Sequence, residues 1–318
     1  MSDPISIATA SSDFRAQLGD AAKALNEIIL GKSEQIDLAL TCLLANGHLL
    51  IEDVPGVGKT TLARALASVL GLDFARVQFT SDLLPADVTG VSVYQKKDVS
   101  FRFHTDPVFT QMLLADEINR ATPKAQSALL EAMQERQATV DGERHPLPNP
   151  FFVVATQNPA DQIGTFDLPE SQLDRFLMTV NIGYPDAEAE RQLLEGVSTT
   201  QKILETGNIL NAEKIRALQG LVSEVTLAPQ LLDYLQALVA YTRESASFVV
   251  GLSPRASIAM ANAARAHALL KGRDAVYPED LQVIFPPIAT HRLVPRDNAG
   301  SRTTTELALQ VLDAVAIP

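Results

Sequence analysis

Short runs of β-branched and aliphatic residues recur between residues 12 and 185, and they alternate with longer segments of helical periodicity. Apolar runs of this length, each separated from the next by a helix, are typical of buried strands in a parallel α/β sheet. The pattern predicts five strands: HLLIED at 48–53, FARVQF at 74–79, MLLADE at 112–117, FFVVAT at 151–156 and FLMTVNI at 176–182.

From about residue 186 onward the pattern is helical only, which predicts an α/β domain over 1–185 and an all-helical second domain over 186–318. Two helix starts are well marked, because Thr122 and Ser253 each stand as an N-cap directly before a proline. The helical segments of the second part are 186–195, 212–222, 228–243, 253–270, 278–292 and 303–316.

Two stretches of the first domain alternate like hairpins. The segment 90–104 alternates around a charged turn, and 137–149 contains the turn pair Asp141-Gly142. We expect both to be insertions on the sheet scaffold. The basic trio Lys96, Lys97 and Arg102 on the first hairpin is small, and we interpret it as a solvated turn.

Composition narrows the class of protein. With 26 Lys+Arg and 38 Asp+Glu the net charge is 26 − 38 = −12, which disfavours broad attraction to nucleic acid or an anionic membrane. No apolar run approaches the roughly 18 residues of a membrane span, and the N-terminal segment lacks the features of a signal peptide. Cys42 is the single cysteine, and the five histidines lack paired metal spacing. We therefore expect a cytoplasmic protein without disulfides or a zinc site.

The segment VPGVGKTT (54–61) follows the first predicted strand and runs into the helical pattern TTLARALASVL. Strand, glycine loop and helix in this order form the context of a P-loop. There, backbone N–H groups surround phosphate oxygens, the lysine reaches the β- and γ-phosphates, and the next hydroxyl ligates Mg²⁺. The sequence predicts binding of ATP with Mg²⁺ by Pro55, Gly56, Val57, Gly58, Lys59, Thr60 and Thr61, with Thr60 as a metal ligand.

This loop departs from the pattern GxxxxGK[ST] at Asp53, which stands where the first glycine belongs. We interpret the departure as tolerated, because Asp53 lies at the strand end before the tightest part of the loop. The alternative is a glycine-rich turn that merely caps a helix. It is less favoured, since Lys59 at a helix N-terminus opposes the helix dipole by ~0.5 kcal/mol unless an anion offsets it.

Asp116 and Glu117 end the third predicted strand, and ligands bind at the carboxyl ends of strands in open α/β sheets. After a P-loop, this order is a Walker B arrangement. Asp116 would hold Mg²⁺ and Glu117 would polarise the attacking water. A solvated acidic strand end is the plainer alternative.

The fourth strand brings Thr156, Gln157 and Asn158 to the same sheet edge. An uncharged amide there could orient the lytic water, and we assign that role to Asn158. The alternative is an asparagine that closes a turn before Pro159. A guanine-reading NKxD motif is rejected, because Pro159 stands in place of its lysine.

Arg175 and Arg255 are the candidates for stabilising the charge of a phosphoryl-transfer transition state. Arg175 could instead pair with neighbouring Asp174 on the surface. Arg255 is the second residue of a capped helix, where a cation is locally unfavourable, so an external anion is the more natural explanation.

Six segments together resemble the MoxR family of AAA+ ATPases, and the resemblance covers nearly the whole chain. LLADEINRA and the preceding QFTSDLLPADVTG are far more discriminating than the P-loop. The segments are VPGVGKTTLA, QFTSDLLPADVTG, LLADEINRATPKAQSALLEAMQE, FFVVATQNP, GTFDLPESQLDRF and LSPRA.

The resemblance implies a sheet of order 5-1-4-3-2, a helical lid with Arg255 as sensor 2, Asn158 as sensor 1, and Arg175 as an arginine finger in the neighbouring subunit's site. It therefore also implies a ring, typically a hexamer. Arg120 would face the next subunit, and the hairpins would be the helix-2 and pre-sensor 1 inserts that touch partners. By the same resemblance, the adenine contact would be Ile29, Leu30 and Gly31.

MoxR relatives commonly serve in enzyme maturation with von Willebrand factor A domain partners, which implies a chaperone-like remodelling ATPase acting on protein clients. Alternatives are a magnesium-chelatase-like motor subunit, a AAA+ nucleic-acid motor and a non-hydrolysing scaffold. The acidic composition counts against the nucleic-acid motor, and the intact set of candidate residues counts against the scaffold.

Overall fold

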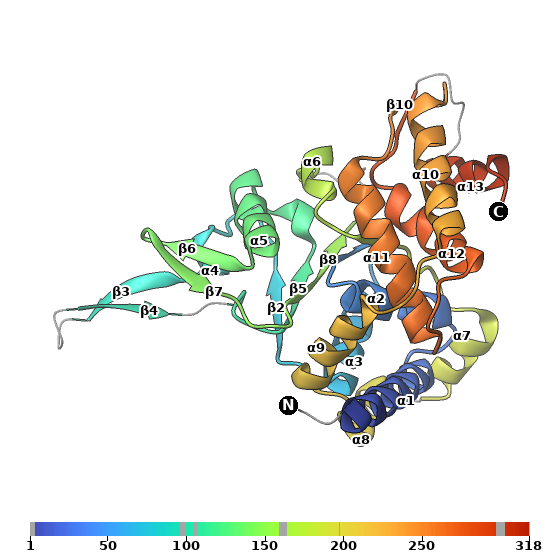
Figure 1. The fold of residues 1–318 in the computed structure, drawn as a ribbon. Coiled ribbons are helices and arrows are strands. Elements are labelled where there is room, and N and C mark those ends of the chain that lie inside the picture. Colours follow the sequence, from blue (N-terminus) through green and yellow to red (C-terminus); the bar gives the residue numbers. More distant parts are fainter. Residues whose placement is uncertain are drawn as a thin grey trace.

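The computed structural model describes residues 4–95, 100–104, 107–158, 164–196, 198–296 and 303–317. Its centre is a five-stranded parallel sheet (Figure 1). The strands are β1 (Leu49–Glu52), β2 (Phe74–Gln78), β5 (Met112–Asp116), β8 (Phe152–Gln157) and β9 (Met178–Val180). All five strand predictions are confirmed, with boundaries that differ by at most two residues.

Across the sheet the strands run β2-β5-β8-β1-β9. Counted in chain order among these five strands, this is 5-1-4-3-2 from the opposite edge, so the predicted order is confirmed. β1 lies between β8 and β9, and β5 lies between β2 and β8. Since all five strands are parallel, their carboxyl ends bring 53, 78, 116–117 and 157–158 to one edge.

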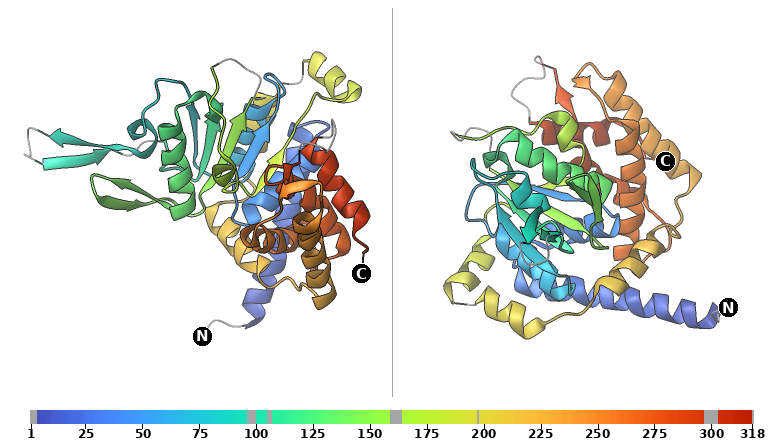
Figure 2. Two further views of the ribbon diagram at one scale, coloured as in Figure 1. Left: turned by 90° about the horizontal axis from the view of Figure 1, so that it is seen from above. Right: turned by 90° about the vertical axis from the view of Figure 1, so that its left-hand side faces the viewer.

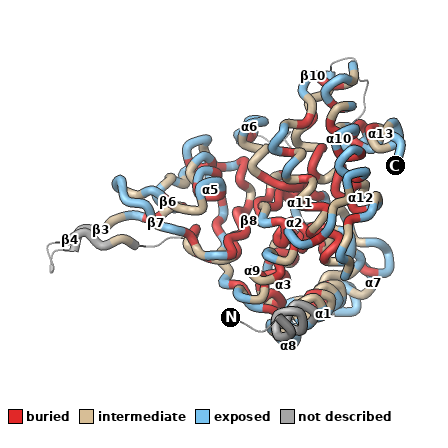
Figure 3. The backbone as a smooth tube through the Cα atoms, in the orientation of Figure 1, coloured by how far each residue is buried: buried red, intermediate tan, exposed pale blue. Residues whose placement is uncertain are grey.

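Successive residues of the central strands alternate between two cores, as the pleat requires. Leu49 and Ile51 join one apolar cluster, whereas Leu50 between them joins the other. The first cluster is covered by α1 (Pro4–Ile28), α2 (Ser33–Leu44), α3 (Lys59–Val69) and the C-terminal helices, and the second by α5 (Pro123–Glu135). Figure 3 shows the central strands buried within these layers.

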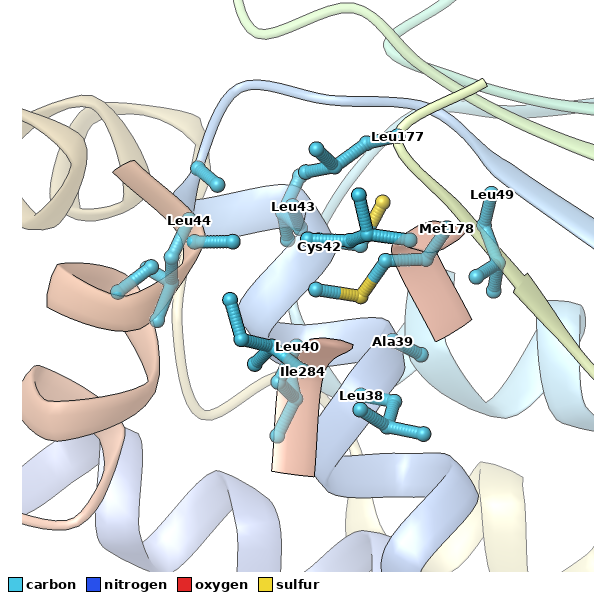
Figure 4. Close-up of a cluster of buried hydrophobic side chains, with 14 of the residues drawn as sticks. Leu38, Ala39, Leu40, Cys42, Leu43, Leu44, Leu49, Leu177, Met178 and Ile284 are labelled. Atoms are coloured by element: carbon cyan, nitrogen blue, oxygen red, sulfur yellow. The ribbon is translucent and has the colours of Figure 1, made fainter. Parts of the chain in front are cut away.

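Helix α2 joins the sheet to the C-terminal helices. Its residues from Leu38 to Leu44 are buried, and they pack with Met178 of β9 and Ile284 of a C-terminal helix (Figure 4). Cys42 lies in this cluster, and burial raises the pKa of its thiol well above the ordinary value. Cys42 is therefore a core residue.

Helices dominate the chain beyond residue 186. They are α7 (Ala187–Leu194), α8 (Thr199–Thr206), α9 (Ala212–Val222), α10 (Pro229–Glu244), α11 (Pro254–Leu270), α12 (Pro278–Ala289) and α13 (Thr304–Ala314). α8 was not predicted. An antiparallel ribbon of β10 (Phe248–Val250) and β11 (Val294–Pro295) also departs from the expectation of helices alone. These strands are too short to leave a recognisable alternation.

The two predicted hairpins are present. β3 (Val91–Gln95) pairs with β4 (Ser100–His104), and β6 (Gln137–Val140) pairs with β7 (Glu143–Pro146). The φ angles of Asp141 and Gly142, 52° and 84°, are those of a tight primed turn. Lys96 and Lys97 lie outside the described residues.

The hairpins project together from the sheet, on the side away from the C-terminal helices (Figures 1 and 2). They touch through a stacked pair, Phe103 and His145, whose ring centroids lie 3.9 Å apart. The remaining elements are short: α4 (Ala86–Thr89), the 3-10 helix η1 (Ile118–Arg120) and α6 (Glu170–Leu173). Within the described part of the chain, no helix has the length and apolarity to cross a membrane.

Candidate functional site

The glycine loop between β1 and α3 has a backbone that only glycine adopts readily. Gly56 and Gly58 have φ of 90° and 95°, and Gly58 is the residue directly before α3. A Cβ on either would meet nothing within 4 Å, so conformation rather than crowding requires glycine there. The loop thus delivers Lys59 as the first residue of α3, as predicted.

Asp53, the departure from the usual P-loop pattern, has a structural explanation. One carboxylate oxygen accepts a hydrogen bond from the Val54 N–H at 2.7 Å, and the other accepts one from the Gly183 N–H at 2.6 Å. Asp53 therefore fastens the start of the loop to the segment after β9. Glycine could not make either contact.

Lys59 is buried and points at the sheet edge, with only 8% of its surface exposed. Its Nζ donates to the Asp53 carbonyl oxygen at 2.6 Å and to Oδ1 of Asn158 at 3.1 Å. Burial lowers the pKa of Lys59, while the charges of Asp53, Asp116 and Glu117 oppose that shift. These carboxylates favour the charged form of Lys59, the form in which a P-loop lysine contacts phosphate oxygens.

Asn158 joins Lys59 to Glu117. Its amide Nδ2 donates to Oε1 of Glu117 at 3.0 Å while its Oδ1 accepts from Lys59. Asn158 is almost fully buried. The structure therefore joins Lys59, Asn158 and Glu117 by hydrogen bonds. The Asn158 amide lies between the lysine predicted to bind the γ-phosphate and the carboxylate predicted to activate water. Residues 159–161 of the rejected NKxD motif lie outside the described residues.

Glu117 carries further contacts on its second oxygen. Oε2 accepts from Nε2 of Gln78 and from Nη1 of Arg120, both at 2.8 Å. Burial alone would raise the pKa of Glu117, but the hydrogen bonds from Arg120 and Asn158 outweigh it and hold the pKa below the ordinary value. Glu117 also has a φ of 55°, a conformation costly for a residue with a Cβ.

Asp116 is buried beside Glu117 and accepts from both sides. Thr156 Oγ1 donates to Oδ1 at 2.6 Å, and the Arg76 guanidinium pairs with Oδ2 at 2.6 Å. Thr156 also accepts from the Glu117 N–H at 2.8 Å, so it orients both acidic residues.

The donor set suits Mg²⁺. A carboxylate at Asp116 and a hydroxyl at Thr60 are the hard oxygen ligands this ion takes when phosphates supply the others. The described residues contain no cluster of three or more His, Cys, Asp or Glu that could form a protein-only metal site. Phosphate oxygens of a bound nucleotide would be suitable further ligands for Mg²⁺ here.

Sequence reasoning did not find Arg76 and Gln78. Both lie on β2, where Gln78 is the register partner of Asp116. A signal was present, because Gln78 is a polar residue near the carboxyl end of a predicted strand, as Asp116 is. The expected sheet order already places β2 beside β5, but polar character alone does not show which side chains of β2 reach the acidic pair.

A cavity of about 250 Å³ opens beside the glycine loop, and Ile29 and Leu30 line it with Gly56, Val57, Gly58 and Thr61. Ile182, Tyr184 and Leu193 make it largely apolar, which suits a base. Gly31, Pro55 and Thr60 do not line it. Gly31 has a different role: a Cβ on it would lie 3.0 Å from the Asp186 carboxylate, so glycine admits the start of α7.

Arg175 and Arg255 line a different cavity, of about 220 Å³, together with Arg136 and Arg292. Arg136 donates to carbonyl oxygens of Asn46 and Phe151, and Arg292 pairs with Asp174. Within the described residues, the side chains of Arg175 and Arg255 make no hydrogen bond or ion pair. The surface pair between Arg175 and Asp174 is therefore not formed.

Comparisons with known proteins agree with this geometry. The model of the ATPase family associated with various cellular activities (AAA) matches residues 48–178, and the AAA lid domain model matches 240–310. A protein from Cytophaga hutchinsonii, provisionally designated an ATPase, has a crystal structure that matches with a TM-score of 0.90 and 35% identity over 98% of both chains.

Relatives by sequence extend over most of the chain. Chaperone MoxR1 of Mycobacterium tuberculosis is 40% identical over 92% of this chain and 80% of its own. Protein MoxR of Paracoccus denitrificans is 35% identical over 89% and 90%, and YeaC of Bacillus subtilis is 44% identical over 96% of both. With this identity, these two domain matches and the P-loop sheet described above, the chain belongs to the MoxR family of AAA+ ATPases.

Proposed function

We propose that this ATPase is a chaperone-like remodelling or maturation factor for protein clients. It would work in the cytoplasm, where ATP and Mg²⁺ are available, as a closed homo-oligomeric ring, typically a hexamer. Each site would combine the P-loop and acidic pair of one subunit with Arg175 and Arg255 of the next. The observation that carries the proposal is the separation of these two arginines from the P-loop cavity of their own chain.

Arg175 is half-buried and Arg255 is exposed, and within the described residues neither side chain has a protein partner, so both guanidinium groups can take an anion from outside the chain. Arg255 lies in the first turn of α11, where a cation also opposes the helix dipole. In a ring, the phosphates held by a neighbour's P-loop would supply that anion. Arginine forks suit phosphate oxygens and stabilise the charge of the transition state.

Within the chain's own half of the site, the residues divide the work. Lys59 and the loop N–H groups would hold the phosphates, Asn158 would orient the water, and Glu117 would take its proton. Thr60 and Asp116 would hold Mg²⁺, which neutralises phosphate charge when bound. Ile29 and Leu30 would cover the base in the apolar cavity. Glu117 begins this cycle fully engaged by Gln78, Arg120 and Asn158.

The two hairpins would contact the protein client. They project beyond the sheet and are joined by the stack of Phe103 on His145, so they would move together (Figure 2). A von Willebrand factor A domain protein is the proposed adaptor between ring and client. The named relatives at 35 and 40% identity, a MoxR protein and a MoxR chaperone, do not favour the magnesium-chelatase-like subunit or the nucleic-acid motor.

The test is the specific ATPase rate as a function of protein concentration, with molar mass measured by light scattering with and without ATP. A specific rate that rises as subunits assemble supports sites shared between subunits. A constant rate from a persistent monomer would leave the ATPase intact and refute the ring.

A further inference from the structure

The four arginines on the Arg175 cavity fall into two kinds. The side chains of Arg175 and Arg255 have no protein partner within the described residues, whereas Arg292 has a partner for each N–H group of its guanidinium. A guanidinium offers five such donors. Arg292 is also buried, with 6% of its side chain exposed. Arg292 therefore has no donor left for a phosphate, and its role must lie in what it holds.

Arg292 holds both residues that flank Arg175. It donates to the Asp174 carboxylate at 2.6 Å, to the Asp174 carbonyl at 3.2 Å, and to the Phe176 carbonyl at 2.6 Å. A further bond reaches the Leu177 carbonyl at 3.0 Å. Three of the four residues 174–177, all except the predicted finger itself, are thus bound by one buried side chain.

The other end of this contact belongs to the C-terminal helices. Arg292 follows α12 closely and donates to the carbonyl of Ile288 within it at 2.6 Å. Neighbouring His291 donates to the Phe176 carbonyl at 3.1 Å, and burial keeps the pKa of His291 well below its ordinary value, so its ring stays neutral. His291 and Arg292, which follow α12 closely, therefore both bind the segment that carries Arg175.

We infer that Arg292 is the positioning residue for Arg175, and that it makes α12 and the 174–177 segment move as one unit. This inference rests on the proposed function, in which Arg175 acts in the neighbouring subunit's site. Any change in the orientation of α12 would then move Arg175 relative to the neighbour's phosphates. A displacement of about 1 Å at such a group costs about a hundredfold in rate.

The experiment uses the full-length variant Arg292→Gln, checked for assembly by light scattering. We expect kcat to fall by about tenfold or more, with ATP affinity unchanged within about twofold, because its own P-loop is intact. Mixing it with Lys59→Ala subunits should restore turnover, since the Lys59→Ala subunit presents a correctly held Arg175 to the intact P-loop. A purely structural defect would not recover on mixing.

Two control experiments distinguish failure of this inference from failure of the proposed function. Arg175→Ala mixed with Lys59→Ala tests the shared site itself, so absence of recovery there refutes the proposed function and this inference with it. Recovery in that pair but not with Arg292→Gln overturns only the inference, as does wild-type turnover of Arg292→Gln. Arg273→Gln is the matched control: it removes an arginine that pairs with buried Asp280 but contacts none of 174–177. An equal loss in this control would also overturn the inference.

Should Arg292→Gln fail to fold, Arg292→Lys provides the same test, because it keeps the charge but not the five-donor fork. We expect an intermediate loss of kcat, recovered on mixing with Lys59→Ala. An unrecovered loss, or none, would contradict the positioning role. Asp174→Asn should lose much less than Arg292→Gln, since four of the five acceptors of Arg292 are backbone carbonyls.

Discussion

Nζ of Lys59 lies 3.1 Å from Oδ1 of Asn158, whose amide nitrogen lies 3.0 Å from the Glu117 carboxylate. One buried amide thus contacts the cation that would bind the γ-phosphate and the carboxylate that would activate water. Its geometry is imposed by the sheet, because β8 lies between β1 and β5, so that Asn158 is placed between the P-loop and the acidic pair.

Replacing Asn158 with alanine removes both of these contacts. We expect kcat to fall by about a hundredfold, because water is no longer oriented, while ATP affinity changes by less than about fivefold. Steady-state kinetics and nucleotide titration measure the two quantities. Asn211→Ala is the matched control, since it removes a helix cap of α9 and should lower stability without slowing turnover. Similar losses of kcat in both variants would contradict the role of Asn158.

Glu117→Gln keeps the shape of the side chain but removes the proton acceptor. We expect retained ATP binding, a ring stabilised by trapped ATP, and turnover lowered by about a thousandfold. The exposed Glu224→Gln serves as a control. Turnover that persisted in Glu117→Gln would exclude Glu117 as the activating base.

Arg120 sets the acid limit of activity through Glu117. The pKa of Glu117 is held below its ordinary value, so its carboxylate is ionised at every pH above that value. The ionised form, and any stability that it confers, is lost only as the pH falls through the lowered pKa. Arg120→Gln removes one of the hydrogen bonds that lower this pKa. The acid limb of kcat, followed between about pH 4 and pH 8, should therefore move to higher pH. A downward shift would contradict this account.

Asp53→Gly restores the glycine of the usual P-loop pattern. The substitution removes two hydrogen bonds, to the N–H groups of Val54 and Gly183, and frees the loop entropically. We expect the free energy of unfolding, measured in urea, to fall by about 2 kcal/mol, and ATP to bind more weakly. Asp53→Asn, whose single amide oxygen can still accept one of these two hydrogen bonds, should lose less. A gain of stability in Asp53→Gly would show that the aspartate is only tolerated.

The sheet and the P-loop could be predicted because their signals are local. Strand runs, a glycine loop and the pair Asp116-Glu117 each occupy a few adjacent residues, and the parallel topology then brings their ends together. Thr156 was placed at the right edge, but its bonds to Asp116 and to the Glu117 backbone could not be inferred from spacing.

Contacts between segments that are far apart along the chain could not be predicted from the sequence. Arg292 stands 118 positions from Asp174, and nothing in its helical context distinguishes it from a surface arginine. Asp53 likewise reaches Gly183 across 130 positions. Such pairs follow from how α12 and the segment after β9 pack against the sheet, which periodicity does not encode.

The central claim is that the arginines of one subunit complete the site of the next, and mixing Arg255→Ala with Lys59→Ala subunits tests it most directly. If Arg255 acts on the neighbour, random mixing in a closed ring unites an intact P-loop with an intact Arg255 at about one interface in four, so about a quarter of wild-type turnover should return. If Arg255 serves its own P-loop, no mixture contains a complete site. Turnover that stays at the level of the separate variants would contradict the account.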